Sequence, residues 1–444
     1  ECMSLLRFSV GNYRSINNVV TLDMAPALGS ATMLSAPAQD LTQPVTAIFG
    51  PNASGKSNFL DAMYFALRAI FSSATSWRDE SDYPTPPYFP FVLDDATLNE
   101  PSFFEFDFTI DNTRYLYGFT YGSDGVIEEW LSYVPKQRWS KCFIRNTSDN
   151  TEFDWNNAFL NRTTQRELGK IDKRELVLSV ALRDKHSILG KIAEALTSSF
   201  NFLPLGDSAQ NARIEQLTSL IHKRHFDLDE ISLLMQAADT GIDSVSIDKT
   251  KVPQHIVDKM NRIITAINNA SDEINNITLS NDEVESVVYN LVFTHKGKNQ
   301  SRTLTMQEES AGTLAWLSIA PQLLQSLRKG TILIADELDS SLHQNLIEMI
   351  IRCFTDRSIN QHGAQLILTT HNTNIIEHME ALALEPATMW FIEKNLHGES
   401  SLFSLADFPN RPEANYERRY LGGRYGALPQ LSPSTLRGLV SQES

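Results

Sequence analysis

Residues 50–57 read Gly-Pro-Asn-Ala-Ser-Gly-Lys-Ser, which is the G-x-x-x-x-G-K-S spacing of a phosphate-binding loop. In such a loop, backbone N–H groups and the positive end of the following helix surround the β-phosphate of a nucleotide. Lys56 adds a positive charge beside the β- and γ-phosphates, and Ser57 offers a hydroxyl to Mg²⁺. The other residues predicted to contact the nucleotide in this segment are Asn52, Ala53, Ser54, Gly55 and Asn58. The sequence therefore predicts a site for a nucleoside triphosphate.

Two apolar runs further along the chain end in side chains that suit phosphate chemistry. Residues 331–335 are followed by Asp336, which can hold Mg²⁺ through water, and by Glu337, which can orient or deprotonate an attacking water. Residues 366–370 are followed by His371, whose neutral imidazole can hydrogen-bond the γ-phosphate or that water. A strand that ends in surface acids, or a structural histidine, would explain each run alone. Together with the phosphate loop, they favour hydrolysis.

A third element, Ser310-Ala-Gly312, lies where a predicted helix opens. A serine and a glycine at a helix N-terminus can form an anion site, because the backbone N–H groups there have no helical partners. The alternative is an ordinary N-cap.

The pattern of apolar residues indicates how these elements are positioned. Alternating residues predict an antiparallel meander at 103–109, 113–121 and 126–134, and a helical period begins near residue 161. Further predicted strands and helices lie at 5–24 (two strands), 58–69 (helix), 161–237 and 252–274 (helices), 284–295 and 303–306 (strands), 311–328 (helix), 331–335, 365–369, 388–393 and 400–404 (strands). We expect an α/β P-loop head split by an insertion: 1–158 and 281–444 form the head, and 159–280 forms a helical, short coiled-coil-like insertion.

Composition narrows the class of protein. The 444 residues carry a net charge of −16, and no apolar run is long enough for a membrane span, so we expect a cytoplasmic protein. The three cysteines are too widely separated for a disulfide framework or a metal site. The acidic balance argues against a basic nucleic-acid coat. Residues 162–185 hold seven basic and four acidic side chains, a run that is usually a solvated helix face.

The order of these motifs resembles that of ABC-type ATPases, and the opening residues 6–15 resemble the branch that includes RecF, SMC proteins and OLD ATPases. The whole chain is similar to bacterial proteins described as AAA family ATPases, among them the anti-phage subunits PARIS AriA, Septu PtuA and AbiL. The resemblance implies that ATP and Mg²⁺ are bound, with Arg14 and Asp339 also at the nucleotide. It further implies a homodimer or higher oligomer in which Ser310 and Gly312 contact the γ-phosphate held by a second subunit.

Departures from this pattern refine the expected function. ABC-type heads carry a glutamine that couples Mg²⁺ to lobe rotation, but no glutamine occurs from residue 58 to Lys136, and we suggest Asp94 in its place. The segment after His371 holds no D-x-D, so we expect no nuclease centre. The resemblance to anti-phage subunits then implies an ATPase that acts as the sensor or scaffold subunit of an anti-phage defence system and controls a separate effector, a nuclease or toxin encoded nearby. The alternative is a DNA repair or recombination ATPase that acts on DNA directly.

Overall fold

The computed structural model describes residues 3–77, 87–148, 152–203, 207–222, 226–251, 287–408, 416–421 and 425–428. The chain divides into a larger unit, Glu1–Leu205 with Leu323–Ser444, and a smaller unit, Gly206–Gln322. In the described part of the chain, no helix combines the length and the apolar composition needed to cross a membrane.

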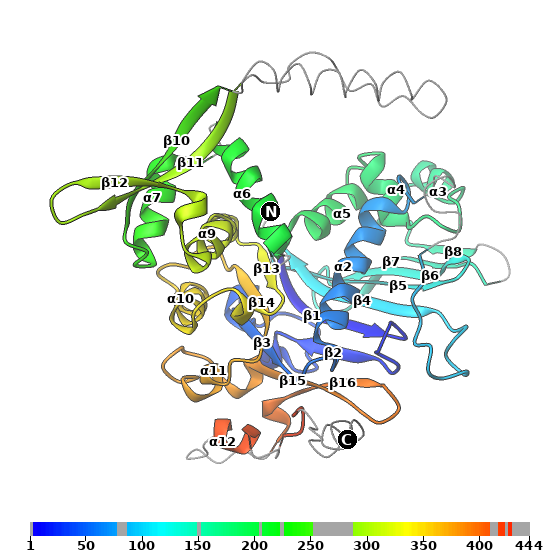
Figure 1. The fold of residues 1–444 in the computed structure, drawn as a ribbon. Coiled ribbons are helices and arrows are strands. Elements are labelled where there is room, and N and C mark those ends of the chain that lie inside the picture. The colour runs from blue at the N-terminus through cyan, green and yellow to red at the C-terminus, as the bar shows by residue number, and fades with distance from the viewer. Residues whose placement is uncertain are drawn as a thin grey trace, which may run out of the picture. The chain divides into compact units, whose positions relative to one another are not determined.

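The centre of the larger unit is a six-stranded sheet with the order β16-β15-β3-β14-β13-β9 (Figure 1). Its strands are β3 (Val45–Phe49), β9 (Phe200–Leu203), β13 (Ile332–Ala335), β14 (Gln365–Thr370), β15 (Met389–Lys394) and β16 (Ser400–Ser404). All neighbours pair in parallel except β15 and β16. The loops after β3, β13 and β14 therefore leave the sheet at the same edge, which is where ligands bind in open α/β sheets.

The larger unit also contains a seven-stranded antiparallel sheet, with the order β2-β1-β4-β5-β6-β7-β8. Its strands are β1 (Met3–Gly11), β2 (Val20–Asp23), β4 (Ser102–Ile110), β5 (Thr113–Gly122), β6 (Gly125–Tyr133), β7 (Ser140–Asn146) and β8 (Glu152–Trp155). The predicted meander is confirmed and continues through β7 and β8, which the sequence did not reveal. The predicted α/β head is confirmed as well.

Helix α2 (Lys56–Ser72) joins the two sheets, because its buried face belongs to one apolar core with residues of β1, β4, β13 and β14. Phe65 of α2 packs against Tyr13 and Phe104, with ring centroids 5.5 and 5.3 Å away. Helix α10 (Gln344–Thr355) packs against β3 and β14. The other α-helices in the described part of the larger unit are α1 (Ala38–Leu41), α3 (Arg162–Leu168), α4 (Val177–Arg183), α5 (Leu189–Ser198), the end of α9 (Ala311–Lys329), α11 (Asn374–Glu377) and α12 (Tyr416–Leu421).

The smaller unit differs from the expected insertion in both bounds and content. It begins at Gly206 and ends at Gln322, rather than spanning 159–280, because β9 pairs with β13 and so belongs to the central sheet. It holds the helices α6 (Asp207–His222) and α7 (Leu228–Ala237), the start of α9 (Ala311–Lys329), and an antiparallel sheet of β10 (Ile242–Lys251), β11 (Val287–Lys296) and β12 (Ser301–Thr305). The described part is thus a mixture of helices and strands. The predicted helix at 252–274 lies outside the described residues.

Candidate active site

The phosphate loop runs from the buried strand β3 into the first turn of α2. Gly55 has a φ of +111°, a conformation that a side chain would strain, and a Cβ there would lie 2.3 Å from the Ser400 hydroxyl. A Cβ on Gly50 would lie 2.4 Å from the carbonyl oxygen of Ile392. Close packing therefore requires both glycines of the motif, and the backbone conformation also requires the one at position 55.

Two serines from distant parts of the chain form hydrogen bonds with the phosphate loop and with the first turn of α2. The Ser400 hydroxyl lies 2.6 Å from the carbonyl oxygen of Ser54 and 2.8 Å from the Ser15 hydroxyl. Ser15 also accepts a hydrogen bond of 2.8 Å from the Asn58 amide. Sequence reasoning did not single out Ser15 or Ser400. Ser15 adjoins the predicted Arg14, but no sequence signal marks Ser400, because its contact depends on β16 reaching the loop.

Lys56 lies inside the loop with 4% of its surface exposed. Its Nζ donates to the carbonyl oxygens of Gly50, at 2.7 Å, and Pro51, at 3.1 Å. Burial lowers the pKa of Lys56, while the facing carboxylates Glu337 and Asp336 act in the opposite direction. The Lys56 ammonium group is thus held by carbonyl oxygens of the loop and interacts electrostatically with the carboxylates that follow β13.

The acidic pair after β13 is positioned by Thr369, a fully buried residue of the neighbouring strand β14. The Thr369 hydroxyl donates to the Asp336 carboxylate and accepts a hydrogen bond of 2.7 Å from the Glu337 backbone N–H. Glu337 has a φ of +49°, an uncommon backbone state for a residue other than glycine. Successive carboxylates therefore leave the strand in different directions. Sequence reasoning missed Thr369, which resembles any threonine in a buried strand.

His371 approaches Glu337 from the end of β14. Its Nε2 lies 3.9 Å from Oε1 of Glu337, and its backbone N–H donates to Asp339 over 3.1 Å. The other carboxylate oxygen of Asp339 is buried without a hydrogen-bond partner, as is the hydroxyl of Ser54. Buried polar atoms without partners are uncommon in proteins. These two oxygens are therefore groups that a ligand could satisfy.

Arg14 reaches this region from the turn between β1 and β2. Its Nε lies 2.6 Å from the Asp61 carboxylate, and its guanidinium lies over the Phe89 ring at 4.9 Å from the centroid. A cavity of about 620 Å³ is lined by Arg14, Ser57, Asp61 and Asp336, among other residues. The predicted magnesium residues Ser57 and Asp336 thus share one cavity with the predicted arginine.

The donor set in this cavity fits magnesium. Among the described residues, no group of three or more His, Cys, Asp and Glu side chains could hold a metal by itself. Mg²⁺ needs no such group, because it usually keeps several waters and binds one or two carboxylates together with substrate phosphates. A hydroxyl from Ser57 and a carboxylate from Asp336 match that description.

A second cavity, of about 1130 Å³, also borders the phosphate loop and is lined by residues 50–54, His371, Thr373, 393–396, 420–421 and 426–428. The chain near its C-terminus helps to enclose it, since the Glu393 carboxylate accepts a hydrogen bond from the Ala427 N–H at 3.1 Å. Asp94, the suggested substitute for the missing glutamine, instead caps the backbone N–H of Ala96 at 2.9 Å and lies 3.5 Å from the Asn17 amide. Asp94 does not line the cavity that holds Ser57 and Asp336.

Ser310 and Gly312 belong to the smaller unit, whereas the other predicted site residues belong to the larger one. The Ser310 hydroxyl accepts a hydrogen bond of 3.1 Å from the Thr313 N–H, so it does cap α9. A Cβ on Gly312 would meet no atom within 4 Å. The glycine therefore leaves an open surface at this helix start.

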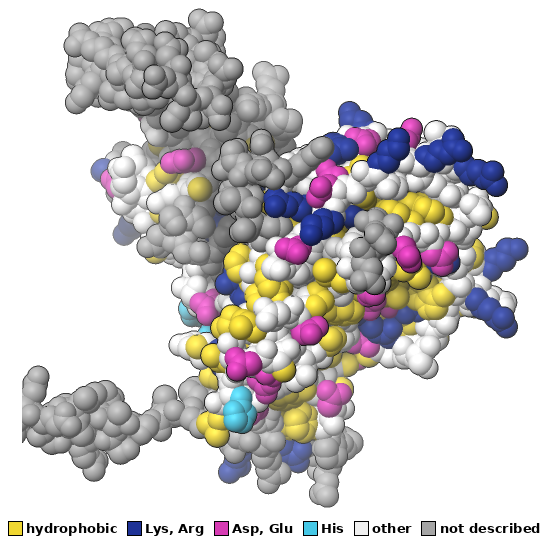
Figure 2. Space-filling view, turned by 90° about the vertical axis from the view of Figure 1, so that its right-hand side faces the viewer, with side chains coloured by type: hydrophobic (Ala, Val, Ile, Leu, Met, Phe, Trp, Pro, Cys, Tyr) yellow, Lys and Arg dark blue, Asp and Glu magenta, His cyan; other side chains and the backbone are white. Residues whose placement is uncertain are grey.

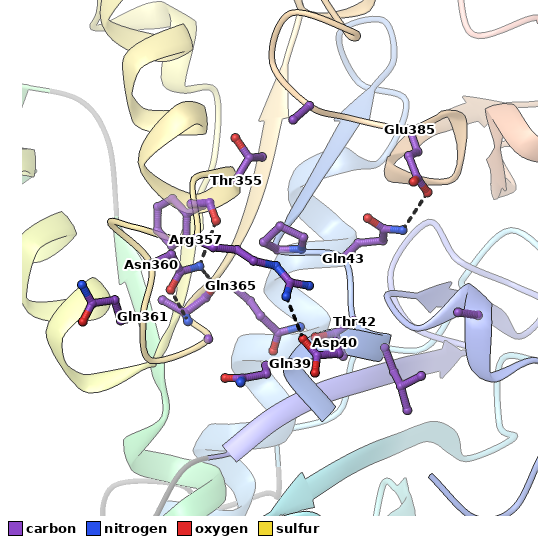
Figure 3. A pocket seen from close by; sticks show the side chains of 17 residues that line it. Gln39, Asp40, Thr42, Gln43, Thr355, Arg357, Asn360, Gln361, Gln365 and Glu385 are labelled. Atoms are coloured by element: carbon purple, nitrogen blue, oxygen red, sulfur yellow. Dashed lines mark hydrogen bonds and ion pairs between the residues drawn. The ribbon is translucent and has the colours of Figure 1, made fainter. Parts of the chain in front are cut away.

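A third cavity, of about 470 Å³, lies at the opposite edge of the central sheet, where β3 and β14 begin (Figure 3). Arg357 extends across it to Asp40, at 3.1 Å, and Gln43 donates to Glu385 at 3.1 Å. Its lining is rich in amide side chains and contains none of the predicted site residues. The candidate active site is therefore the one around the phosphate loop.

A match to one protein family covers most of the chain. A family profile described as "AAA domain, putative AbiEii toxin, Type IV TA system" matches residues 45–377, from β3 past His371. The chain is similar to the SMC head domain from Thermotoga maritima, with 13% identity and a TM-score of 0.40, over 90% of this chain and 98% of that one. It is also similar to a Pyrococcus furiosus Smc head with an extended coiled coil bound to the C-terminal domain of ScpA, with 13% identity, a TM-score of 0.37, and coverage of 90% and 96%. No curated protein sequence matches it significantly.

Proposed function

Because the chain belongs to this AAA domain family, we propose that it binds ATP with Mg²⁺ and hydrolyses it. The observation that carries the proposal is the meeting of Lys56, Asp336, Glu337 and His371 at one edge of the central sheet. These residues come from the ends of three parallel strands, so a triphosphate in the loop would lie among all of them.

Each side chain has a distinct role in this proposal. Lys56 neutralises phosphate charge, and Ser57 with Asp336 holds Mg²⁺, which supplies further charge neutralisation at the phosphates when bound. Glu337 accepts a proton from, or orients, the attacking water. His371, 3.9 Å from Glu337, donates a hydrogen bond to the γ-phosphate or positions that water.

Phosphate release from ATP by the purified protein tests this assignment. Lys56→Ala should lose nucleotide binding, because the phosphate charge would face an anion site without its cation. Glu337→Gln should bind ATP as wild type does and hydrolyse it at least about 100-fold more slowly, the contribution typical of general acid–base catalysis. Equal turnover in wild type and Glu337→Gln would remove Glu337 from the role of base.

The proposed assembly is a homodimer or a higher oligomer with composite sites. Ser310 is committed to capping α9, but the helix start next to it is open at Gly312. An exposed helix N-terminus attracts anions, and a γ-phosphate held by the phosphate loop of a second subunit is the anion that we propose for it.

The biological role that we propose is that of an ATPase subunit in an anti-phage defence system, which holds or releases a separate effector. The family description names a putative AbiEii toxin of a type IV TA system, and this is the part of the description that supports the proposal. The net charge of −16 suits a basic effector. Expression of the chain with and without the protein encoded next to it, followed by phage challenge, tests the proposal. Protection by the chain alone would contradict it.

The alternative is a DNA repair or recombination ATPase, and one observation favours it. Figure 2 shows several Lys and Arg side chains along the upper and right edges of one face, with some acidic side chains among them. Two of the basic residues in the run 162–185 form ion pairs, namely Lys173 with Asp124 and Arg183 with Asp184. A titration with duplex DNA at several salt concentrations separates the two functions. Affinity that falls steeply with salt would favour direct action on DNA.

A further inference from the structure

Asp61 lies in the cavity beside the phosphate loop and has no part in the function proposed so far. It follows Ser57 by four residues on α2, so both side chains lie on the same face of the helix. Both line the cavity of about 620 Å³ that Asp336 also lines. A second carboxylate thus faces the space where Ser57 and Asp336 would hold magnesium.

Two donors hold Asp61 in place. The Tyr13 hydroxyl donates to its Oδ2 at 2.7 Å, and Arg14 Nε lies 2.6 Å from the same oxygen. Burial, followed by the bond to Asp61, raises the pKa of Tyr13, so the phenol keeps its proton and remains a donor. The Asp61 side chain is still 38% exposed. One of its oxygens is therefore anchored by the protein, while the carboxylate stays open to the cavity.

No glutamine lines the described part of this cavity. The sequence has no glutamine from residue 58 to Lys136, and Asp94 bonds elsewhere. Among the described residues that line the cavity, the oxygen-bearing side chains are Ser57, Asn58, Asp61, Tyr64 and Asp336. Only Asp61 combines a free carboxylate oxygen with a bond to the turn that carries Arg14.

We propose that Asp61 is the positioning residue for the magnesium ion, accepting hydrogen bonds from its bound water, and that it releases Arg14 to the nucleotide phosphates. This inference rests on the proposed binding of ATP and Mg²⁺. With nucleotide absent, Asp61 neutralises Arg14 at 2.6 Å. A triphosphate offers the guanidinium a stronger, bidentate partner, which leaves Oδ2 of Asp61 to Tyr13 and the other carboxylate oxygen to the water of the magnesium ion. The exchange links the ion to the turn between β1 and β2.

The test is a titration of Mg²⁺ into the full chain with the β,γ-imido analogue of ATP, in which binding is measured and hydrolysis plays no part. Outer-sphere partners of a metal are typically worth 10- to 100-fold in metal affinity. Asp61→Asn should therefore raise the half-saturating Mg²⁺ concentration by about tenfold or more. Asp61→Glu keeps the carboxylate and should restore much of the loss. Asp154→Asn, which removes an exposed carboxylate paired with Lys141, is the matched control and should change nothing.

A role in holding Arg14 alone is separated by repeating the titration in an Arg14→Ala background. If Asp61 faces magnesium, Asp61→Asn raises the half-saturating concentration there as well. An unchanged value in the wild-type background, or a rise that disappears with Arg14→Ala, overturns the inference. Thermal unfolding of each variant shows that it is folded. If the wild-type chain binds no analogue at any Mg²⁺ concentration, the proposed function itself fails, which is a different result from equal binding by wild type and Asp61→Asn.

Discussion

Replacement of Ser400 by alanine tests whether the phosphate loop is shaped by its buried supports. The Ser400 hydroxyl lies 2.6 Å from the Ser54 carbonyl oxygen, and Ser54 is 2% exposed. Removing the donor leaves a buried acceptor without a partner, which costs about 1–3 kcal/mol. The empty loop can relax and bring this carbonyl to water, but the loop that holds a triphosphate cannot. The unpaired carbonyl oxygen should therefore weaken nucleotide binding.

The expected magnitude follows from the binding equilibrium. Since about 1.4 kcal/mol corresponds to tenfold in affinity, the dissociation constant for ATP should rise by about 5- to 150-fold in Ser400→Ala. The assay is equilibrium binding of ATP with Mg²⁺, next to thermal unfolding, which should change little. Ser401→Ala is the matched control, because Ser401 is the exposed neighbour on β16. Equal ATP affinity in the two variants would refute the idea that Ser400 shapes the loop.

Three further outcomes are expected. Glu129→Gln should lower the free energy of unfolding by about 3–5 kcal/mol in denaturant titrations. Glu129 and Arg145 form a fully buried ion pair at 3.5 Å, and the substitution removes the charge that faces the arginine. A loss below about 1 kcal/mol would contradict this prediction. A mixture of inactive Lys56→Ala and inactive Ser310→Arg chains should regain part of the ATPase activity, since one intact site can form at a mixed interface; no recovery in mixed oligomers identified by native mass spectrometry would indicate sites completed within one subunit. The purified chain with Mg²⁺ or Mn²⁺ and ATP should leave plasmid, linear DNA and tRNA intact, and cleavage that vanishes in Glu337→Gln would reveal a nuclease.

Local sequence patterns predicted the parts of the fold that local chemistry determines. The phosphate loop, the apolar strands β13 and β14 and the alternating strands β4 to β6 all carry their signal within about ten residues, and the structure has each of them. The strand β9 was missed because Phe200–Leu203 is only four residues long and follows directly on α5. Its assignment depends on pairing with β13, which is far away in the sequence.

The supports of the site were less predictable than the site residues. Thr369, Ser400 and Asp61 act through hydrogen bonds to groups that only the tertiary fold brings near them. Their residue types are common and their spacing follows no motif. Motifs therefore identified the groups that suit the chemistry, while the groups that hold these in position became visible only with the fold.

The hydrogen bonds that Ser15 and Ser400 make around the phosphate loop also affect when the protein can first bind a nucleotide during its synthesis. Ser15 and Ser400 are 385 positions apart, and both contact the loop region. At about 5–20 residues per second, a ribosome needs roughly 20–80 seconds to pass from one serine to the other. A nascent chain that has emerged only through α2 already carries the complete phosphate-loop motif. It still lacks β16, the strand whose Ser400 hydrogen-bonds to the loop. Nucleotide binding should therefore begin late in translation.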